Sequence, residues 1–445
     1  MLKNIWFIIL IPVLLVALVS SGALAGDDEI LSELQMLKQR MAVLEQKLIE
    51  RDAVPQQTGE VAVTEQDTAT IRQVVEEVVA ANKPNFKIGG ALRVNYGIQD
   101  WSETSQDKGG DFTFDTFRFN IDGSIGDMIL SAEYRFYPEY DFNTIHHGYI
   151  GYNFTDDLQG QIGVQQVPFG LQPYASHNFW FSGAYYVGLE DDYDMGVKLL
   201  YTPGPLSISA AFYKNGELGK ASDADRYSVD VIGSGADDDA GNEETNQGNL
   251  RVAYLFDHSD TAKTEIGASA EYGGIYNNHT GNMGDHWAGA VHLNGNYGPF
   301  NLQLEYVRYQ YNVENPVSIK GLDANDKEID VLTDNDIITL GGYSYTWGAP
   351  ADADIAIFNL SYSLPVSWGP VNNLTFYSDN TLITPDENQF DDVWQNVVGM
   401  MVSSGPVYTY FDIISGENMT FSGGDMTAPD NERTTRFNVN FGYYF

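Results

Sequence analysis

Apolar and polar residues alternate with a period of two from Phe86 to the end of the chain. In the first such segment, every second residue from Phe86 to Ile98 is apolar or glycine, and Lys87, Arg93 and Asn95 stand between them. Successive side chains of a β-strand point to opposite faces, so this alternation predicts a strand with one apolar and one polar face. About 9 to 11 residues of a tilted strand suffice to cross a membrane.

The same pattern recurs along the chain and predicts about 16 strands, although 14 or 18 also fit. An even number is typical of bacterial single-chain membrane barrels. The predicted strands span residues 86–99, 117–123, 130–136, 148–154, 158–165, 195–201, 206–212, 250–256, 263–273, 286–297, 299–311, 353–363, 371–379, 393–403, 405–414 and 437–445.

Tight turns and long connections alternate between these strands. Gly126-Asp127 and Gly298-Pro299 are turn sequences. A membrane barrel has short turns at one end and long loops at the other, whereas a soluble barrel would turn its apolar faces inward. The sequence does not state which face is inside, but the aromatic-rich apolar faces favour lipid outside. The long connections are expected at 100–111, 168–192, 215–247, 312–350 and 415–433.

The N-terminus has the pattern of an export signal. Lys3 precedes an apolar run over 5–19, and Ala23-Leu24-Ala25 is a small-residue cleavage site. We therefore expect a signal peptide over 1–25; an uncleaved anchor helix is the alternative. No later stretch reaches the roughly 18 to 20 apolar residues of a membrane helix, so a membrane protein of this sequence must be a closed barrel.

A heptad pattern follows the signal and predicts a periplasmic coiled coil over 26–51. Apolar residues spaced by four and three have charged neighbours, as in a coiled-coil seam. A coil this short is marginal alone, so we expect it to act within a homotrimer; a single docked amphipathic helix is the alternative. A linker and short helix are expected over 52–85, before the barrel at 86–445. The residues predicted to mediate oligomerisation are Ile30, Leu34, Leu37, Met41, Leu44 and Leu48.

The charge and the lack of cysteine exclude several kinds of site and partner. The chain of 445 residues has a formal net charge of −39 and no cysteine, which excludes disulfides and thiolate metal sites and makes nucleic-acid binding improbable. The acidic residues gather in the long connections, for example at 190–192 and 237–244. They are expected to be solvated, or to bind divalent cations shared with lipopolysaccharide. No specific metal site and no cofactor are predicted.

Charged residues on the polar phase of the strands are candidates for lining a pore. Ion pairs between neighbouring strands are one interpretation of these residues. A constriction with separated positive and negative charges is the other. The candidate pore-lining residues are Arg93, Arg118, Asp122, Glu133, Arg135, Lys198, Arg251, Lys263, Glu305 and Arg436.

The connection at 168–192 is rich in aromatic residues and is predicted to fold inward as a constriction. Its rings either stack against a sugar or aromatic solute, or anchor the loop to the inner wall. The candidate constriction residues are Phe169, Tyr174, His177, Trp180, Tyr185, Glu190, Asp191 and Asp192.

Enzyme and adhesin functions were weighed against a channel. A barrel hydrolase needs a placed Ser/His or Asp/His set, but the seven histidines are scattered. His146-His147 is the adjacent pair, and neighbouring residues of a regular strand point to opposite faces. We therefore predict no catalytic site. A surface receptor or adhesin is the other alternative, but the sequence contains no repeats that would support it.

One motif resembles a known family. The run from Gly163 to Leu171, GVQQVPFGL, ends a strand and opens the 168–192 connection. It is similar to a signature of the phosphate-selective porin O and P family. The resemblance implies a 16-stranded trimeric porin of the Gram-negative outer membrane, a channel for small polar solutes. Gln166 stands where that family often has lysine, so phosphate specificity is not implied.

The terminal aromatic, Phe445, is similar to the assembly signal that the barrel-insertion machinery reads in outer-membrane proteins. We therefore expect a homotrimer, and we expect the chain to contact the barrel-insertion machinery, lipopolysaccharide and outer-membrane lipids.

Overall fold

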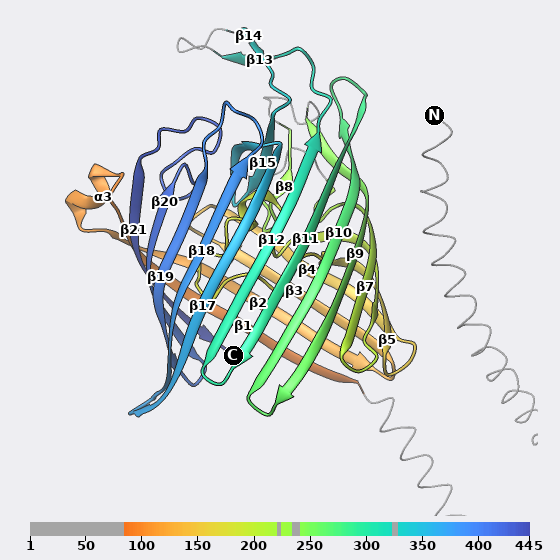
Figure 1. The fold of residues 1–445 in the computed structure, drawn as a ribbon, viewed down its shortest axis with the longest axis vertical. Helices are drawn as coiled ribbons and strands as arrows, with labels where there is room; N and C mark the ends of the chain where they lie inside the picture. The colour runs from red at the N-terminus through yellow and green to blue at the C-terminus, as the bar shows by residue number, and fades with distance from the viewer. Residues whose placement is uncertain (1–83, 220–223, 234–240, 323–327) are drawn as a thin grey trace, which may run out of the picture. The chain divides into compact units, whose positions relative to one another are not determined.

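Sixteen antiparallel strands close into a barrel in the computed structural model, which describes residues 84–219, 224–233, 241–322 and 328–445 (Figure 1). Each strand pairs with its neighbours along the chain, and β1 closes on β21. The predicted number and antiparallel arrangement are confirmed. The barrel strands are β1 (Asn85–Gln99), β2 (Asp111–Ile125), β3 (Met128–Tyr137), β4 (Phe142–Asn153), β5 (Leu158–Gln166), β6 (Tyr193–Tyr201), β7 (Leu206–Gly216), β9 (Asn242–Ser259), β10 (Ala262–Asn277), β11 (Met283–Tyr297), β12 (Phe300–Asn312), β17 (Asp352–Trp368), β18 (Val371–Pro385), β19 (Val393–Ser404), β20 (Val407–Glu417) and β21 (Arg433–Tyr444).

The signal peptide, the coiled coil and most of the linker lie outside the described residues. No helix within the described ranges is long and apolar enough to cross a membrane.

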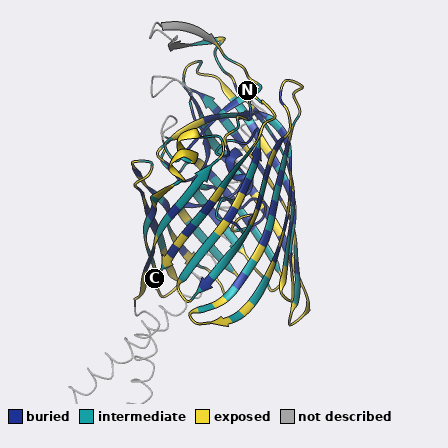
Figure 2. Ribbon diagram, turned by 90° about the vertical axis from the view of Figure 1, so that its left-hand side faces the viewer, coloured by how far each residue is buried: buried dark blue, intermediate teal, exposed yellow. Residues whose placement is uncertain are grey.

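The outer face of the barrel is apolar and the inner face is polar. Ile162 is 60% exposed and Val398 is 56% exposed, whereas Gln165, Asn359 and Asn438 are fully buried. Exposed and buried residues alternate along the strands (Figure 2). A barrel in water has the opposite arrangement, so this surface suits a lipid environment.

The connections differ between the two ends of the barrel, as predicted, but less uniformly. Short turns join the strands at one end, for example at 126–127 and 298–299. The other end carries the long connections, but three connections there are also short, at 138–141, 278–282 and 386–392. The strands also extend further than the alternation indicated: β9 begins at Asn242, inside the connection predicted to run to 247.

The long connections contain their own secondary structure. Helix α3 (Glu103–Lys108) begins after Ser102, whose side chain caps it, and ends at Gly109 in the left-handed conformation. A 3₁₀ turn, η1 (Tyr185–Val187), lies between β5 and β6. Two of the connections also share a sheet. This sheet has the order β16-β15-β8 and consists of β8 (Asp230–Val231), β15 (Ile337–Gly342) and β16 (Tyr345–Pro350). A separate hairpin consists of β13 (Ser318–Leu322) and β14 (Glu328–Leu332).

Two β-bulges place extra polar residues inside the barrel. The first bulge is in β2: Arg93 of β1 pairs with Thr116, and the next residue of β1 pairs with Phe114. Asp115 is therefore the extra residue of β2. In β4 the register skips His146. A bulge lets two successive side chains share a face. The expectation that His146 and His147 point to opposite faces is therefore wrong: their Nδ1 atoms lie 2.9 Å apart.

The C-terminal residue helps to close the barrel. The amide of Phe445 donates to the carbonyl of Gly90 at 3.0 Å, and the amide of Gly90 donates back at 2.9 Å. Gly90 is required by this close packing, because an added Cβ would lie 2.3 Å from the carbonyl oxygen of Arg118. The ring of Phe445 is 56% exposed on the apolar side.

Candidate functional site

The connection between β5 and β6, residues 167–192, crosses the inside of the barrel; we call it the inner loop. Its first part is bonded to β9, β10 and β12. The amide of Gly170 donates to Ser269 Oγ at 2.9 Å, and Arg251 Nε donates to the carbonyl of Gly170 at 2.8 Å. The amide of Leu171 donates to Glu305 Oε1 at 3.2 Å. In the strand order β9 is three positions from β5 and β12 is six positions from it, so the loop leaves its own side of the barrel and enters the interior.

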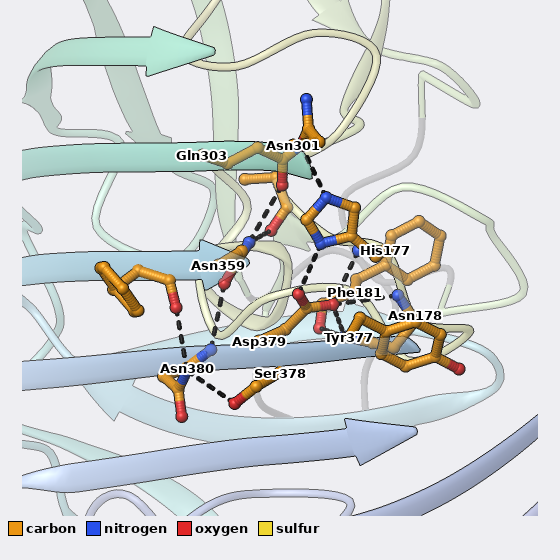
Figure 3. Close-up of polar contacts among 12 residues, drawn as sticks. His177, Asn178, Phe181, Asn301, Gln303, Asn359, Tyr377, Ser378, Asp379 and Asn380 are labelled. Atoms are coloured by element: carbon orange, nitrogen blue, oxygen red, sulfur yellow. Dashed lines mark hydrogen bonds and ion pairs between the residues drawn. The ribbon is translucent and has the colours of Figure 1, made fainter. Parts of the chain in front are cut away.

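Asp379 of β18 bonds His177 and Asn178 in the middle of the inner loop, and we call this set of contacts the clasp (Figure 3). One carboxylate oxygen of Asp379 accepts from the amides of His177 at 2.7 Å and Asn178 at 3.0 Å. The other oxygen lies 2.7 Å from His177 Nδ1, and His177 Nε2 lies 2.7 Å from Asn301 Oδ1. Burial lowers the pKa of His177, but the hydrogen bond and charge of Asp379 outweigh burial, so the pKa is raised. The clasp therefore includes a charge-assisted bond when His177 is protonated.

The last part of the inner loop is held by further side chains of the wall and by its own carboxyl group. The amide of Gly183 donates to Thr381 Oγ1 at 3.0 Å, and Asn359 donates to the carbonyl of Ala175 at 2.6 Å. Glu190 accepts from the amide of Ala175 at 3.0 Å and bonds the hydroxyl of Ser182. Burial raises the pKa of Glu190 to about 8, so this internal tie is made by a neutral carboxyl group at pH 7.

Four arginines on four consecutive strands face the inner loop; we call them the arginine wall. They are Arg436 of β21, Arg93 of β1, Arg118 of β2 and Arg135 of β3. Each guanidinium lies over an aromatic ring, which stabilises a cation where water is partly excluded. The distances from guanidinium carbon to ring centroid are 4.5 Å for Arg436 and Trp180, 4.7 Å for Arg93 and Phe179, 4.9 Å for Arg118 and Tyr444, and 4.3 Å for Arg135 and Tyr227.

Carboxylates compensate the arginine wall in part. Arg93 pairs with Asp115 at 2.8 Å. Arg135 and Arg118 share Glu133, at 2.6 and 3.6 Å. Among the described residues, three of the four arginines thus pair with two carboxylates, and Arg436 forms no ion pair. The predicted ion pairs between neighbouring strands are therefore present, and the four arginines outnumber the two carboxylates; a constriction with separated charges stays a prediction.

A cavity of about 500 Å³ lies between the arginine wall and the inner loop. Arg93, Arg118 and Arg135 line one side, and Asp191 lies on the loop side. Most of the remaining lining is aromatic. The lining rings include Tyr137, Tyr140, Tyr174, Phe179, Trp180, Phe181, Tyr185, Tyr186, Tyr227, Tyr343, Tyr408, Tyr410 and Tyr444. Guanidinium groups and aromatic faces can together hold a small polar or anionic solute.

The other charged residues predicted to line a pore lie away from this cavity. Lys198 donates to the carbonyl of Gln166 at 2.7 Å and, with Arg251 and Glu305, supports the inner loop. Asp122 is exposed and accepts from Ser131 at 2.7 Å, and Lys263 pairs with Asp257 at 3.3 Å.

The eight inner-loop residues predicted to form the constriction divide in a similar way. Tyr174, Trp180, Tyr185 and Asp191 line the cavity. Phe169, Glu190 and Asp192 are buried, and His177 holds the clasp. Among the aromatic residues, Tyr174, Trp180 and Tyr185 therefore line the open space and Phe169 packs in the core, whereas stacking against a solute stays a prediction.

Sequence reasoning missed several residues of this site. Asp115 and His146 enter the interior through bulges, which leave no mark in the alternation. Tyr227 and Tyr343 reach the cavity from distant connections. Asp379 is also missing from the predicted residues, although it is a charged residue on a strand like the candidate pore-lining residues.

The chain matches no protein-family model and no curated protein sequence. Solved outer-membrane proteins share its fold. OmpT (in-vitro folded, trimer form), an outer membrane protein of Vibrio cholerae, is 14% identical over 81% of this chain and 99% of that chain, with a TM-score of 0.50. An anion-selective porin from Comamonas acidovorans is 12% identical over 82% and 100%, also at 0.50. The outer membrane channel DcaP of Acinetobacter baumannii is 11% identical over 81% and 97%, at 0.50. Identities this low establish a shared porin-type fold and no more.

Proposed function

We propose that this protein is an outer-membrane porin that lets small polar solutes pass between the inner loop and the arginine wall. The observation that carries the proposal is the closed barrel with an apolar outer face, a polar interior and a cavity of about 500 Å³ beside the inner loop. The resemblance of GVQQVPFGL to a porin signature supports the same conclusion, without phosphate specificity.

The inner loop acts as the constriction in this proposal. Side chains of β9, β10, β12, β17 and β18 bond its backbone, so it is held across the interior. A fixed loop gives a passage of constant size, and the aromatic rings of the lining give solutes apolar surfaces to contact. The net positive wall makes the passage weakly selective for anions.

The wider biological setting follows from the same proposal. The barrel resides in the outer membrane of a Gram-negative bacterium, in contact with lipopolysaccharide, and is inserted by the barrel-assembly machinery. The protein assembles as a homotrimer, with residues 26–51 forming a periplasmic coiled coil. The trimer form of the Vibrio cholerae protein OmpT supports this assembly.

Single-channel recording tests the function directly. Purified full-length protein in planar bilayers should give stepwise conductance increases. Folded protein that inserts without steps would refute the porin, and hydrolysis of lipid or peptide in its place would favour a barrel hydrolase. Reversal potentials in a KCl gradient should show a modest anion preference.

A further inference from the structure

A group of carboxylates lies where the inner loop joins the barrel; we call it the carboxylate cluster. Asp192 ends the inner loop, Asp194 is in β6 and Asp230 is in β8, and all three are buried. One carboxylate oxygen from each lies within 4.8 Å of the others. Glu217 is buried and Glu244 half-buried beside them.

Several oxygens of this cluster have no hydrogen-bond donor in the described part of the chain. They are Oδ1 of Asp194, Oδ1 of Asp230 and both carboxylate oxygens of Glu217. Asp194 and Asp230 are each only 2% exposed. Buried polar groups are nearly always paired, so these oxygens indicate a missing electropositive partner.

One cation of the described chain pairs with the cluster. Arg226 bonds Asp230 and lies 3.6 Å from Glu217. A single guanidinium does not balance five carboxyl groups.

The geometry points to a bound cation better than to shared protons. Two oxygens bound to one Ca²⁺ at about 2.4 Å are at most about 4.8 Å apart, and the three aspartate oxygens meet this limit.

We propose that Asp192, Asp194 and Asp230 bind a calcium ion. The ligands are all oxygens, which suits a hard cation, and Ca²⁺ accepts six to eight of them in flexible geometry. Glu217, Glu244 or waters complete the shell. Mg²⁺ fits less well, because it requires near-ideal octahedral geometry and retains much of its water.

The ion would join two long connections directly and a third one through strand β8. Asp192 belongs to the inner loop and Asp230 to the connection between β7 and β9. Strand β8 also pairs with β15 of the connection between β12 and β17, through Leu340 and Val231. Calcium therefore fixes the end of the inner loop and, through β8, the sheet above it.

The test measures calcium binding to the full-length protein in detergent after treatment with EGTA. Isothermal titration of wild type with CaCl₂ should show one site per chain that is tighter than the binding to the other acidic loops. Asp194→Asn and Asp230→Asn should each weaken this site at least about tenfold. Asp392→Asn removes the same charge from the short connection 386–392, where the side chain is exposed, and should leave the site unchanged.

Three results would overturn the proposal. They are the absence of a distinct site in wild type, undiminished binding in both cluster variants, or an equal loss in Asp392→Asn, which would mean diffuse binding to acidic loops. If a variant fails to fold, wild type alone decides: calcium should raise its melting temperature after EGTA treatment and protect the inner loop from protease, and no change in either refutes the site. Channel conductance is not used, so the outcome is independent of the porin proposal.

Discussion

Replacing Arg118 with glutamine should reduce the anion preference of the channel. The side chain of Arg118 is 22% exposed, borders the cavity and shares Glu133 with Arg135. Glutamine keeps a polar side chain of similar length but removes the charge. The arginine wall then falls from four cations and two carboxylates to three cations and two carboxylates, which halves its net charge.

The size of the effect follows from Coulomb's law. An ion that passes about 5 Å from a unit charge in a water-filled passage interacts with it by about 0.8 kcal/mol, which is about a fourfold change in the permeability of that ion. Screening at 0.15 M salt, where the Debye length is about 8 Å, reduces this to about twofold. Because chloride and potassium change in opposite directions, the variant should lower the chloride-to-potassium permeability ratio by about fourfold at 0.15 M salt, and more at low salt.

Reversal potentials in a KCl gradient measure this ratio. Lys263→Gln is the matched control, because Lys263 also lies on the polar phase but pairs with Asp257 away from the cavity. The reasoning fails if Arg118→Gln leaves the reversal potential unchanged, or if both variants shift it equally.

Three further predictions concern the inner loop and the oligomer. The raised pKa of His177 means that its bond to Asp379 is complete below about pH 6.5 and weakens as the pH rises through the raised value, so open-channel current noise should increase in that window. Asp379→Asn should be noisy at every pH, and noise independent of pH in wild type would contradict the clasp. Burial raises the pKa of Glu190 to about 8, so wild type should lose thermal stability as the pH rises from about 4.3 to 8, and Glu190→Gln should lose less over this window; parallel pH profiles of the two proteins would count against this. Deleting residues 28–50 should lower the melting temperature of the trimer on gels more than that of the barrel, and an unchanged trimer would remove the role of the coiled coil.

The strands were predictable because lipid constrains both faces of a barrel wall. The outward position must be apolar and the inward position polar along each crossing, so the alternation is strong and the count of sixteen was correct. The signal disappears where strands leave the apolar zone. Residues 242–247 of β9 are all polar and were therefore assigned to a loop, although their backbones pair in the sheet.

The candidate site was less predictable, since its contacts join residues far apart in the sequence. His177 and Asp379 are 202 positions apart, and their contact depends on the register of every strand between them. Bulges add a second difficulty. Asp115 faces Arg93 because β2 has one more residue than its partner at that point, and alternation alone assigns Asp115 to the lipid-facing phase.

The acidic connections show what composition alone does not reveal about burial. The sequence predicts that their carboxylates are solvated or bind divalent cations, yet Asp191 and Asp192 of the inner loop are buried. A loop that enters the barrel must bond its own peptide groups, and the wall supplies side chains such as Ser269, Glu305 and Asp379 for this purpose. Polar residues are therefore drawn inward together with the loop. The same requirement that fixes the inner loop thus buries carboxylates at its end, where the proposed calcium ion would balance them.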